Sequence, residues 1–476
     1  DQKWLNSSKV ICALRRINVY TQFFCNDRFK VLQCMAMNQA KWKDVPMSKR
    51  DIMGSVQFGT NKVGRIMNEL KSEGYIMQQD IARGQFLLTS KGKKLIRQFT
   101  QNEKEISIFS FFSGSGFLDL GFEKAGYMIE FVNEYSPSFL KAYQYAREKM
   151  DMREPKYGYF NEDINVFLSE RKDELKEYIR KEKMGNKMVG FIGGPPCPDF
   201  SVGGKNRGKD GENGKLSSAY IDLIIEMKPD FFLFENVKGL WRTARHREFF
   251  EELKEKLHIA GYLTTERLTN ALEFGVPQDR ERILLFGIRS QVLGDKRKCQ
   301  VFDAEFPWVS YSQYSLEQIK AIHWPDMDDF HENGKISLPK DIIEELTVEY
   351  WFDKNKVNEH PNANSFFIPR DGLSKMKAIK EGDASRKSYK RLHRWRYSPT
   401  AAYGNNEVHL HPYKIRRISV SEALAIQSLP REFELPKDMS LSDMFKTVGN
   451  GVPYLLAFGV AKSIQDYLYI NGILDV

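Results

Sequence analysis

The stretch "FSFFSGSGFLDLGF", residues 109–122, joins an apolar run to two closely spaced glycines and then to a second apolar segment. The first run has the length of a β-strand, and the segment after Gly116 has helical spacing. Glycines such as Gly114 and Gly116 at this junction let the backbone approach a ligand and leave helix N–H groups free to bind it. The stretch therefore predicts a strand–loop–helix unit of an α/β fold, although phosphate-binding loops and plain tight turns share this pattern.

Apolar runs of strand length alternate with helical patterns along residues 105–290. The expected strands are Ile106–Phe112, Met128–Glu134, Met188–Gly194, Phe231–Val237 and Ile283–Arg289. The expected helices are Pro137–Met150, Asn165–Lys183, Ser217–Lys228 and Arg247–Ala260, followed by Val420–Ser428 and Pro453–Ile470 after an irregular region. This alternation predicts an α/β fold with a mostly parallel, Rossmann-like sheet and helices on both faces.

Chemically active side chains follow several of these runs, and the carboxyl ends of parallel strands meet at one edge of a sheet. Glu134 ends the second run, and Glu235 lies near the end of the fourth. Asp163 precedes a helix, where it either caps the helix or bonds an adenine amino group. Cys197 follows the third run within "FIGGPPCPDFSVGG", residues 191–204, whose prolines and glycines impose a stiff, irregular loop. A thiol and a carboxyl group on neighbouring strand ends indicate one reactive site.

Two further segments contain polar residues beside a predicted element. Arg280 and Arg282 stand two apart at the start of a strand, so their side chains share one face. The segment Gly449-Asn450-Gly451-Val452-Pro453 precedes the final helix. Taken singly, each feature has an ordinary explanation: a surface ion pair, a buried cysteine, a helix cap or a plain turn. Their occurrence together in this order favours a catalytic site.

Residues 1–100 have the pattern of a separate small domain. Ser48–Val56 is predicted to be a helix capped by Ser48, and a second helix runs from Thr60, its expected cap, to Glu73. Two short strands, Tyr75–Met77 and Phe86–Leu88, and a last helix, Lys91–Phe99, follow. This order resembles a winged helix-turn-helix, whose second helix enters the DNA major groove. The resemblance implies that the DNA-facing residues are Asn61, Lys62, Arg65 and Asn68, with Arg83 at the wing tip. Domains of this kind also bind protein or dimerise.

The distribution of charge indicates a polyanionic partner. The chain has a formal net charge of +9, and residues 1–100 hold 18 Lys and Arg against 7 Asp and Glu. Residues 370–417 hold 13 basic against 4 acidic residues. Two separate basic segments favour nucleic acid that is met at two places, although solvated surface lysines give the same totals.

Composition argues against several other classes of protein. Five cysteines without regular spacing do not suggest a disulfide scaffold, and the eight histidines form no zinc-ligand pattern with them. We therefore expect no metal. We find no signal-peptide core, and no apolar run approaches the roughly 20 residues that span a bilayer. We expect a soluble, cytoplasmic protein.

The ordered motifs resemble those of the DNA (cytosine-5) methyltransferases, which use S-adenosylmethionine. The residues that match the family's motifs, in order, are Phe112–Gly116, Glu134, Asp163, Pro196-Cys197, Glu235-Asn236-Val237, Gln278–Arg282 and Gly449-Asn450. The resemblance covers residues 105–290 and 400–470, including "HPYKIRRISVSEALAIQSLP" at 411–430. Three residues depart from the family's usual Asp, third glycine and Gln: Ser110, Phe117 and Pro198.

This resemblance implies a fold and a set of roles. It implies the S-adenosylmethionine-dependent methyltransferase fold at 105–290, completed by 414–476, with a target-recognition domain at 291–413 and the winged helix-turn-helix at 1–100. The implied catalytic residues are Cys197, Glu235, Arg280 and Arg282. The implied cofactor-binding residues are Phe112, Gly114, Ser115, Gly116, Glu134, Asp163, Ile164, Gly194, Pro196, Asn450 and Val452. In the recognition domain, basic residues alternate with aromatic ones, and Arg391, Arg394 and Arg396 are expected to contact DNA.

The implied reaction is methylation of C5 of a flipped-out cytosine in duplex DNA through a covalent Cys197 adduct. Such an enzyme would protect host DNA in the nucleoid as part of a bacterial restriction-modification system, with a cognate endonuclease acting separately. Two alternatives remain open. One is an RNA cytosine-5 methyltransferase on the same scaffold. The other is a transcription regulator that uses the N-terminal domain, and it does not exclude the first.

Overall fold

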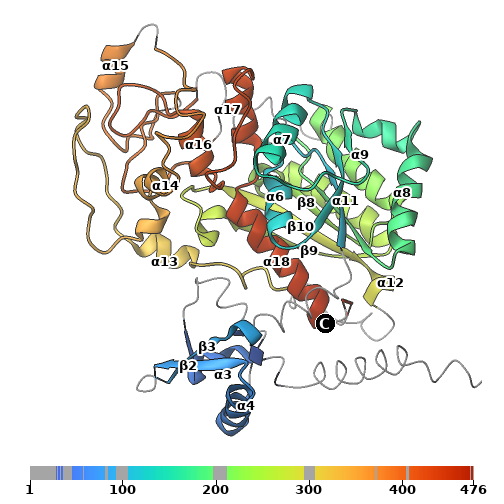
Figure 1. The fold of residues 1–476 in the computed structure, drawn as a ribbon. Helices are drawn as coiled ribbons and strands as arrows, with labels where there is room; N and C mark the ends of the chain where they lie inside the picture. Colours follow the sequence, from blue (N-terminus) through green and yellow to red (C-terminus); the bar gives the residue numbers. More distant parts are fainter. Residues whose placement is uncertain are drawn as a thin grey trace, which may run out of the picture. The chain divides into compact units, whose positions relative to one another are not determined.

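The computed structural model describes residues 46–56, 58–80, 84–92, 106–196, 212–293, 306–369, 372–386, 388–401, 403, 407–471 and 473–474, with Arg28, Val31, Leu32, Cys34 and Met35. The chain forms two compact units, drawn as ribbons in Figure 1. One comprises Asp1–Lys104 with Leu474–Val476, and the other comprises Glu105–Ile473.

The described residues of the N-terminal unit include two complete helices and a three-stranded antiparallel sheet. Its elements are β1 (Met47–Ser48), α3 (Lys49–Val56), α4 (Thr60–Ser72), β2 (Ile76–Asp80) and β3 (Gln85–Leu88), with strand order β1-β3-β2. The predicted Ser48 cap is present: Ser48 N donates to Asp51 Oδ2 at 3.0 Å, and Asp51 N donates to Ser48 Oγ at 3.2 Å. The prediction that Thr60 caps α4 was wrong, because Gly59 has the extended cap conformation and Thr60 is already helical. The predicted helix Lys91–Phe99 lies mostly outside the described residues.

The larger unit is built on the mostly parallel, Rossmann-like sheet that the apolar runs predict. Its strands are β4 (Ile106–Phe111), β5 (Met128–Asn133), β6 (Tyr159–Phe160), β7 (Met188–Gly193), β8 (Phe231–Val237), β9 (Tyr262–Asn270) and β10 (Glu281–Arg289). Their order is β6-β5-β4-β7-β8-β10-β9. The first five strands in this order are parallel, and β10 lies antiparallel between β8 and β9. The chain order reverses at β4 and β7, and ligands of such sheets bind beyond the carboxyl ends of the strands at this point.

Helices cover both faces of the sheet (Figure 1). One face carries η1 (Ile164–Leu168), α8 (Lys172–Met184), α9 (Glu212–Met227) and α11 (Ala244–Ile259), and the other carries α6 (Phe117–Lys124), α7 (Pro137–Lys149) and α18 (Tyr454–Ile470). The remaining helices around the sheet are α10 (Lys238–Arg242), η3 (Ala271–Phe274), α12 (Ser290–Leu293), α16 (Val420–Ile426) and α17 (Leu441–Asn450). The single helix predicted at Asn165–Lys183 is divided, because Ser169 has φ −125° and ψ −99°, which no helix accommodates.

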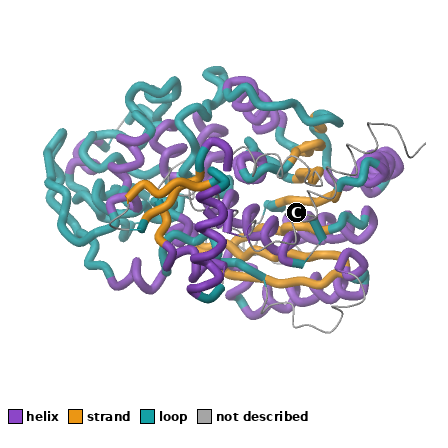
Figure 2. Tube along the Cα trace, turned by 60° about the horizontal axis from the view of Figure 1, so that its bottom comes forward, coloured by secondary structure: helices purple, strands orange, loops and turns teal. Residues whose placement is uncertain are grey.

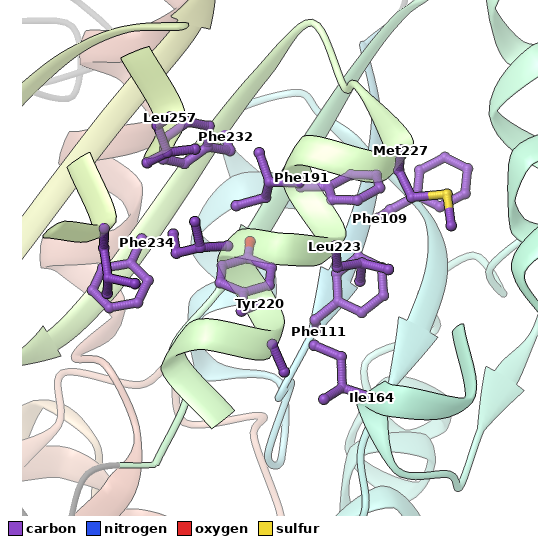
Figure 3. Close-up of a cluster of buried hydrophobic side chains, with 14 of the residues drawn as sticks. Phe109, Phe111, Ile164, Phe191, Tyr220, Leu223, Met227, Phe232, Phe234 and Leu257 are labelled. Atoms are coloured by element: carbon purple, nitrogen blue, oxygen red, sulfur yellow. The ribbon is translucent and has the colours of Figure 1, made fainter. Parts of the chain in front are cut away.

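Aromatic side chains fill the layer between the sheet and α8, α9 and α11 (Figure 3). Phe111 on β4 and Phe191 on β7 have ring centroids 4.9 Å apart, and Tyr220 on α9 lies 6.0 Å from Phe111. These rings are fully buried. Such packing holds the ends of neighbouring strands at fixed spacing, which a catalytic site at that edge requires.

The strand–helix alternation stops after α12, as predicted. Residues 306–413, called here the recognition region, contain long loops and only short helices (Figure 2). These helices are α13 (Leu316–Ala321), η6 (Glu344–Leu346), α14 (Val348–Lys354) and α15 (Leu373–Lys377). Within the described ranges of the whole chain, no helix has both the length and the apolar character needed to cross a membrane.

Candidate active site

The loop Phe112–Gly116, called here the cofactor loop, is strained and closely packed. Phe112 has φ 53°, a left-handed conformation that is uncommon for an aromatic residue and typical of functional sites. Gly116 has φ 85°, and a Cβ there would stand 2.6 Å from the Tyr143 ring. Ser115 Oγ lies 2.7 Å from Thr447 Oγ1, so a hydroxyl pair ties the loop to α17. The loop therefore has a defined shape between β4 and α6.

Glu134 follows β5 beside the cofactor loop. Its Oε2 accepts a hydrogen bond from Gly114 N, and its Oε1 accepts one from Ser136 N, both at 2.8 Å. Burial raises the pKa of Glu134, and these backbone N–H groups partly oppose that effect. The neighbouring Tyr135 side chain is 71% exposed. A carboxylate held in this way can accept hydrogen bonds from ribose hydroxyls.

Asp163 and Ile164 lie at the beginning of η1. Asp163 Oδ1 accepts from Asn165 N at 2.9 Å, so this side chain caps η1, one of the two roles predicted for it. Ile164 is only 2% exposed and belongs to the aromatic core layer (Figure 3). The start of η1 is thus fixed both by a cap and by apolar packing.

Glu235 and Arg282 form a buried ion pair between β8 and β10. The strand register places Leu284 opposite Glu235, so Arg282 reaches Glu235 diagonally on the same face. Arg282 Nε lies 2.9 Å from Glu235 Oε1. Burial raises the pKa of Glu235, against the opposing effect of Arg282 and Arg280. A carboxyl group with a raised pKa is suited to carry a proton to a substrate.

The proline-rich loop after β7 begins against Glu235. A Cβ on Gly194 would stand 2.6 Å from Glu235 Oε2, so any side chain there would displace the Glu235 carboxyl group. Asn236 Nδ2 donates to Pro195 O at 3.4 Å, and Pro196 is exposed. Cys197, the predicted nucleophile, lies outside the described residues. The loop that leads to Cys197 therefore begins with Gly194 beside Glu235 and Pro195 bonded to Asn236.

Arg280 has very different surroundings from Arg282. It is fully buried, and its Nη2 donates to Gly449 O at 2.8 Å and to Gly451 O at 3.1 Å. Burial lowers the pKa of Arg280, and Arg282 adds to this effect. The two arginines therefore have different partners: Arg282 pairs with Glu235, and Arg280 donates to backbone oxygens near the end of α17.

The segment after α17 closes the site. Asn450 is exposed at the last residue of α17, whereas Val452 is 6% exposed. A Cβ on Gly451 would overlap the ring of Phe117. Phe117 stands where the methyltransferases commonly have a third glycine, so the larger ring occupies the space that Gly451 leaves free.

These residues fit S-adenosylmethionine. A Cβ built on Gly114 would meet no atom within 4 Å, so the cofactor loop faces open space above its backbone. Glu134 borders this space through its bond to Gly114, and the Ser115–Thr447 pair brings α17, which carries Asn450, to the same loop. A carboxylate for ribose hydroxyls, a glycine loop and an exposed amide are the groups that such a nucleoside with an amino-acid tail requires. Among the described residues, no group of three or more His, Cys, Asp or Glu could hold a metal ion.

Arg391 and Arg394 lie inside the recognition region rather than on its surface. Arg391 is 1% exposed, and it donates to the main-chain oxygens of Ile379, Met376, His411 and Lys414. Arg394 bonds both carboxylate oxygens of Glu381 at 2.8 Å. Burial therefore argues against the prediction that these two side chains contact DNA. Arg396 is half-buried and donates to Pro325 O at 3.4 Å, so its DNA contact stays a prediction.

The DNA-facing residues predicted on α4 lie opposite its buried stripe. Val63, Ile66, Met67 and Leu70 are buried, as their spacing predicts. Asn61, Arg65 and Asn68 are exposed, and Lys62 is half-buried with its Nζ 4.1 Å from the centre of the Phe58 ring. Arg83 lies outside the described residues.

Sequence reasoning missed three residues that shape the site. Asn236 holds Pro195, Thr447 holds Ser115, and Gln278 accepts from Ala401 N at 2.9 Å. Asn236 and Gln278 stand inside the matched motifs, so their position was a usable signal. Thr447 gave none, because its partner is 332 residues away in the chain.

The chain is similar to known proteins in sequence and in structure. The sequence profile of the C-5 cytosine-specific DNA methylases matches residues 106–466. The type II methyltransferase M.NmeDI of Neisseria meningitidis serogroup C is 57% identical over 387 residues, which are 80% of this chain and 89% of that protein. The type II methyltransferase M.FnuDI of Fusobacterium nucleatum is 31% identical over 76% of this chain and 95% of that protein. Among solved structures, the Dnmt2 methyltransferase of S. pombe is 13% identical with a TM-score of 0.48, over 77% of this chain and 99% of that one. The chain therefore belongs to the C-5 cytosine-specific DNA methylases, enzymes that use S-adenosylmethionine as methyl donor.

Proposed function

We propose that this chain is a type II modification enzyme that methylates C5 of cytosine within one short sequence of duplex DNA. The observation that carries the proposal is the buried Glu235–Arg282 pair beside the anchored start of the Cys197 loop. Two relatives named type II methyltransferases, at 57% and 31% identity, support the same role. On this proposal the enzyme protects host DNA in the bacterial nucleoid from a cognate endonuclease that acts separately.

The cofactor is held by residues at the carboxyl ends of β4, β5 and β7. S-adenosylmethionine supplies a methyl group on a positively charged sulfur, which makes that carbon electrophilic. Phe112 packs on the adenine, Glu134 accepts from the ribose hydroxyls, and Asn450 meets the amino-acid end. The other residues proposed to line this site are Gly114, Ser115, Gly116, Asp163, Ile164, Gly194, Pro196 and Val452.

Cys197 activates the cytosine, because C5 of an intact cytosine ring is a poor nucleophile. Its thiolate adds to C6, forming an S–C6 bond and moving an electron pair toward C5. Protonated Glu235 hydrogen-bonds N3 as charge develops on the ring, and Arg282 donates to O2. C5 gains the methyl group as the methyl–sulfur bond breaks, which leaves S-adenosylhomocysteine; the C5 proton then passes to solvent and the S–C6 bond breaks. These last steps restore the ring double bond and the thiolate.

The target base must leave the duplex to reach this site. Extrusion of one nucleotide costs a few kcal/mol, which contacts to the flipped base and to the DNA backbone offset. Arg396 and the exposed lysines of the recognition region are proposed to contact DNA there.

The test is methylation of a randomised duplex library with S-adenosylmethionine, read by bisulfite sequencing, with Cys197→Ser as control. One enriched cytosine context in the wild type alone would establish both the reaction and the target. Methylation of a cytosine-rich RNA but of no duplex would favour the RNA alternative. Substantial turnover by Cys197→Ser would refute the covalent mechanism.

We infer further that the N-terminal unit is a winged helix-turn-helix that binds DNA through α4. A short strand, two helices and a hairpin, paired in a sheet of order β1-β3-β2, support this inference, as does the exposed row Asn61, Arg65 and Asn68. Deletion of residues 1–104 tests its role. Unchanged methylation with lost binding to one promoter would favour a transcription regulator, whereas collapse of methylation on all DNA would make the unit part of the enzyme.

A further inference from the structure

A buried polar cluster lies behind the active site. It consists of Gln278, Arg280 and Gln427, each 0% exposed and called here the glutamine–arginine cluster. Gln278 Nε2 donates to Gln427 Oε1 at 3.1 Å, and Arg280 Nη1 donates to Gln278 Oε1 at 3.4 Å. The four hydrogen bonds that Arg280 makes within the described chain go to carbonyl or amide oxygens. Burying a cation that is not hydrogen-bonded to a carboxylate costs free energy, so its retention requires a reason.

On one side the cluster fixes the backbone around Asn450. Arg280 Nη2 bonds the carbonyl oxygens of Gly449 and Gly451, which flank Asn450. Gln427 Nε2 bonds Gly451 O at 3.3 Å and Val448 O at 2.5 Å. Because the carbonyl groups on both sides of Asn450 are held from inside, the backbone that carries the exposed Asn450 side chain has a fixed position.

On its other side the cluster fixes the end of the recognition region. Ala401 N donates to Gln278 Oε1 at 2.9 Å, and Arg280 Nη1 donates to Ala401 O at 3.2 Å. Ser398 extends this contact, because its N donates to Pro277 O and its O accepts from Asp279 N, both at 2.8 Å. The segment Pro277–Arg280 leads directly into β10, which carries Arg282.

We propose that Arg280, with Gln278 and Gln427, is a positioning residue that sets Asn450 and the Ala401 segment against the strand that presents Arg282. Arg280 thereby controls affinity for the cofactor without touching cytosine, and Arg282 is the arginine that acts on the base. The part concerning Arg282 rests on the proposed function. A planar guanidinium can reach four oxygens from three chain segments, which a lysine ammonium on the same backbone cannot.

The test compares Arg280→Lys with its matched control Arg282→Lys in the full chain. Calorimetry measures binding of S-adenosylhomocysteine without DNA, and single-turnover methylation measures the chemical step at saturating cofactor. Arg280→Lys should weaken S-adenosylhomocysteine binding about tenfold or more. Arg282→Lys should change that affinity less than about twofold, yet slow single turnover by about a hundredfold or more.

A second variant keeps the test decisive if Arg280→Lys does not fold. Gln427→Met has similar volume but lacks the hydrogen bonds to Val448 and Gly451, and it should weaken cofactor binding about threefold. Lower melting temperatures with unchanged affinity in both variants would reduce the cluster to a structural role and overturn the proposal. Equal effects of Arg280→Lys and Arg282→Lys on single turnover, with unchanged affinity, would also overturn it. A wild type that binds S-adenosylhomocysteine but methylates no duplex would refute the proposed function and leave the affinity comparison valid.

Discussion

The sheet and the recognition region are held together by different interactions. Against the sheet, rings such as Phe111, Phe191 and Tyr220 pack in a fully buried layer. In the recognition region, buried Arg391 and Arg394 bind main-chain oxygens and Glu381. An apolar core gains free energy from area removed from water, whereas a buried ionic network mainly fixes geometry. The comparison teaches that arginines interleaved with aromatic residues need not mark a DNA surface.

The largest expected effect is the loss of one partner of a buried pair in the recognition region. Arg394→Ala leaves Glu381, 1% exposed, without its cation, and should lower the free energy of unfolding by about 3–5 kcal/mol. Urea denaturation measures it. Arg386→Ala is the control, because Arg386 is 61% exposed and its contact with Asp383 is 3.6 Å; it should cost under about 1 kcal/mol. Equal costs for both would contradict the comparison.

The pH dependence of stability should differ between two buried carboxyl groups. Burial raises the pKa of Glu123 on α6 to about 7. Protonation of Glu123 therefore stabilises the folded chain. This contribution is complete below the pKa that Glu123 has in the unfolded chain, and it is lost as the pH rises through about 7. Burial alone would raise the pKa of Glu422 on α16, but His411 and Arg416 hold it below its ordinary value. The stability from Glu422 is therefore present at neutral pH and lost as pH falls below its unfolded pKa.

Denaturant titrations of wild type, Glu123→Gln and Glu422→Gln at several pH values check both signs. The difference in free energy of unfolding between the wild type and Glu123→Gln should decrease between pH 5 and 7 by up to about 1.4 kcal/mol per pH unit. The free energy of unfolding of the wild type should exceed that of Glu422→Gln by a constant amount between pH 5 and 7. This difference should disappear in acid. The same slope for both variants would count against the assignment.

A smaller effect is expected from a conservative change in the aromatic layer. Phe191→Leu keeps an apolar side chain but removes the ring contacts with Phe109 and Phe111, and should cost about 1–2 kcal/mol. Urea denaturation of this variant beside Arg394→Ala ranks the two regions directly. A cost for Phe191→Leu above that of Arg394→Ala would reverse the comparison.

The smallest effect on stability is expected on the surface of the recognition region. Lys375 and Lys377 are exposed on α15, and their alanine variants should change the free energy of unfolding by less than about 0.5 kcal/mol. If DNA meets this surface, each variant should reduce the dependence of log affinity on log salt by about 1. Binding of a random-sequence duplex at several salt concentrations measures this slope. Lys256→Ala on α11 is the control, and an equal loss of slope there would show that the effect is not local.

The sheet was largely predictable from sequence because its strands are continuous apolar runs. All five expected strands are present, with ends shifted by at most two residues. The prediction missed several elements, among them β6, β9 and α17. Strand β9 lies at the edge of the sheet and reads "YLTTERLTN". Most of its residues are polar, so it lacks the alternation of apolar and polar residues that predicts a strand. Strand β6 has only two residues, too few for any periodic pattern.

The site was predictable in its motifs but not in its contacts. The Glu235–Arg282 pair follows from two motifs on strands that the topology makes neighbours. The burial of Arg280 does not follow, because spacing of two in a strand places two side chains on one face without saying what covers each. The burial of Arg391 and Arg394 does not follow for a similar reason, since their partners Met376, Ile379 and Glu381 give no sequence signal of contact.

The most direct test of the central claim is covalent trapping at Cys197. The wild-type chain and Cys197→Ser are incubated with S-adenosylmethionine and the enriched duplex, in which 5-fluorocytosine replaces the target base and blocks loss of the C5 substituent. Intact mass after denaturation reports the product. The account predicts a one-to-one protein–DNA adduct in the wild type and none in Cys197→Ser. An adduct in Cys197→Ser, or methylation of the unmodified duplex by the wild type without a trappable adduct, would contradict it.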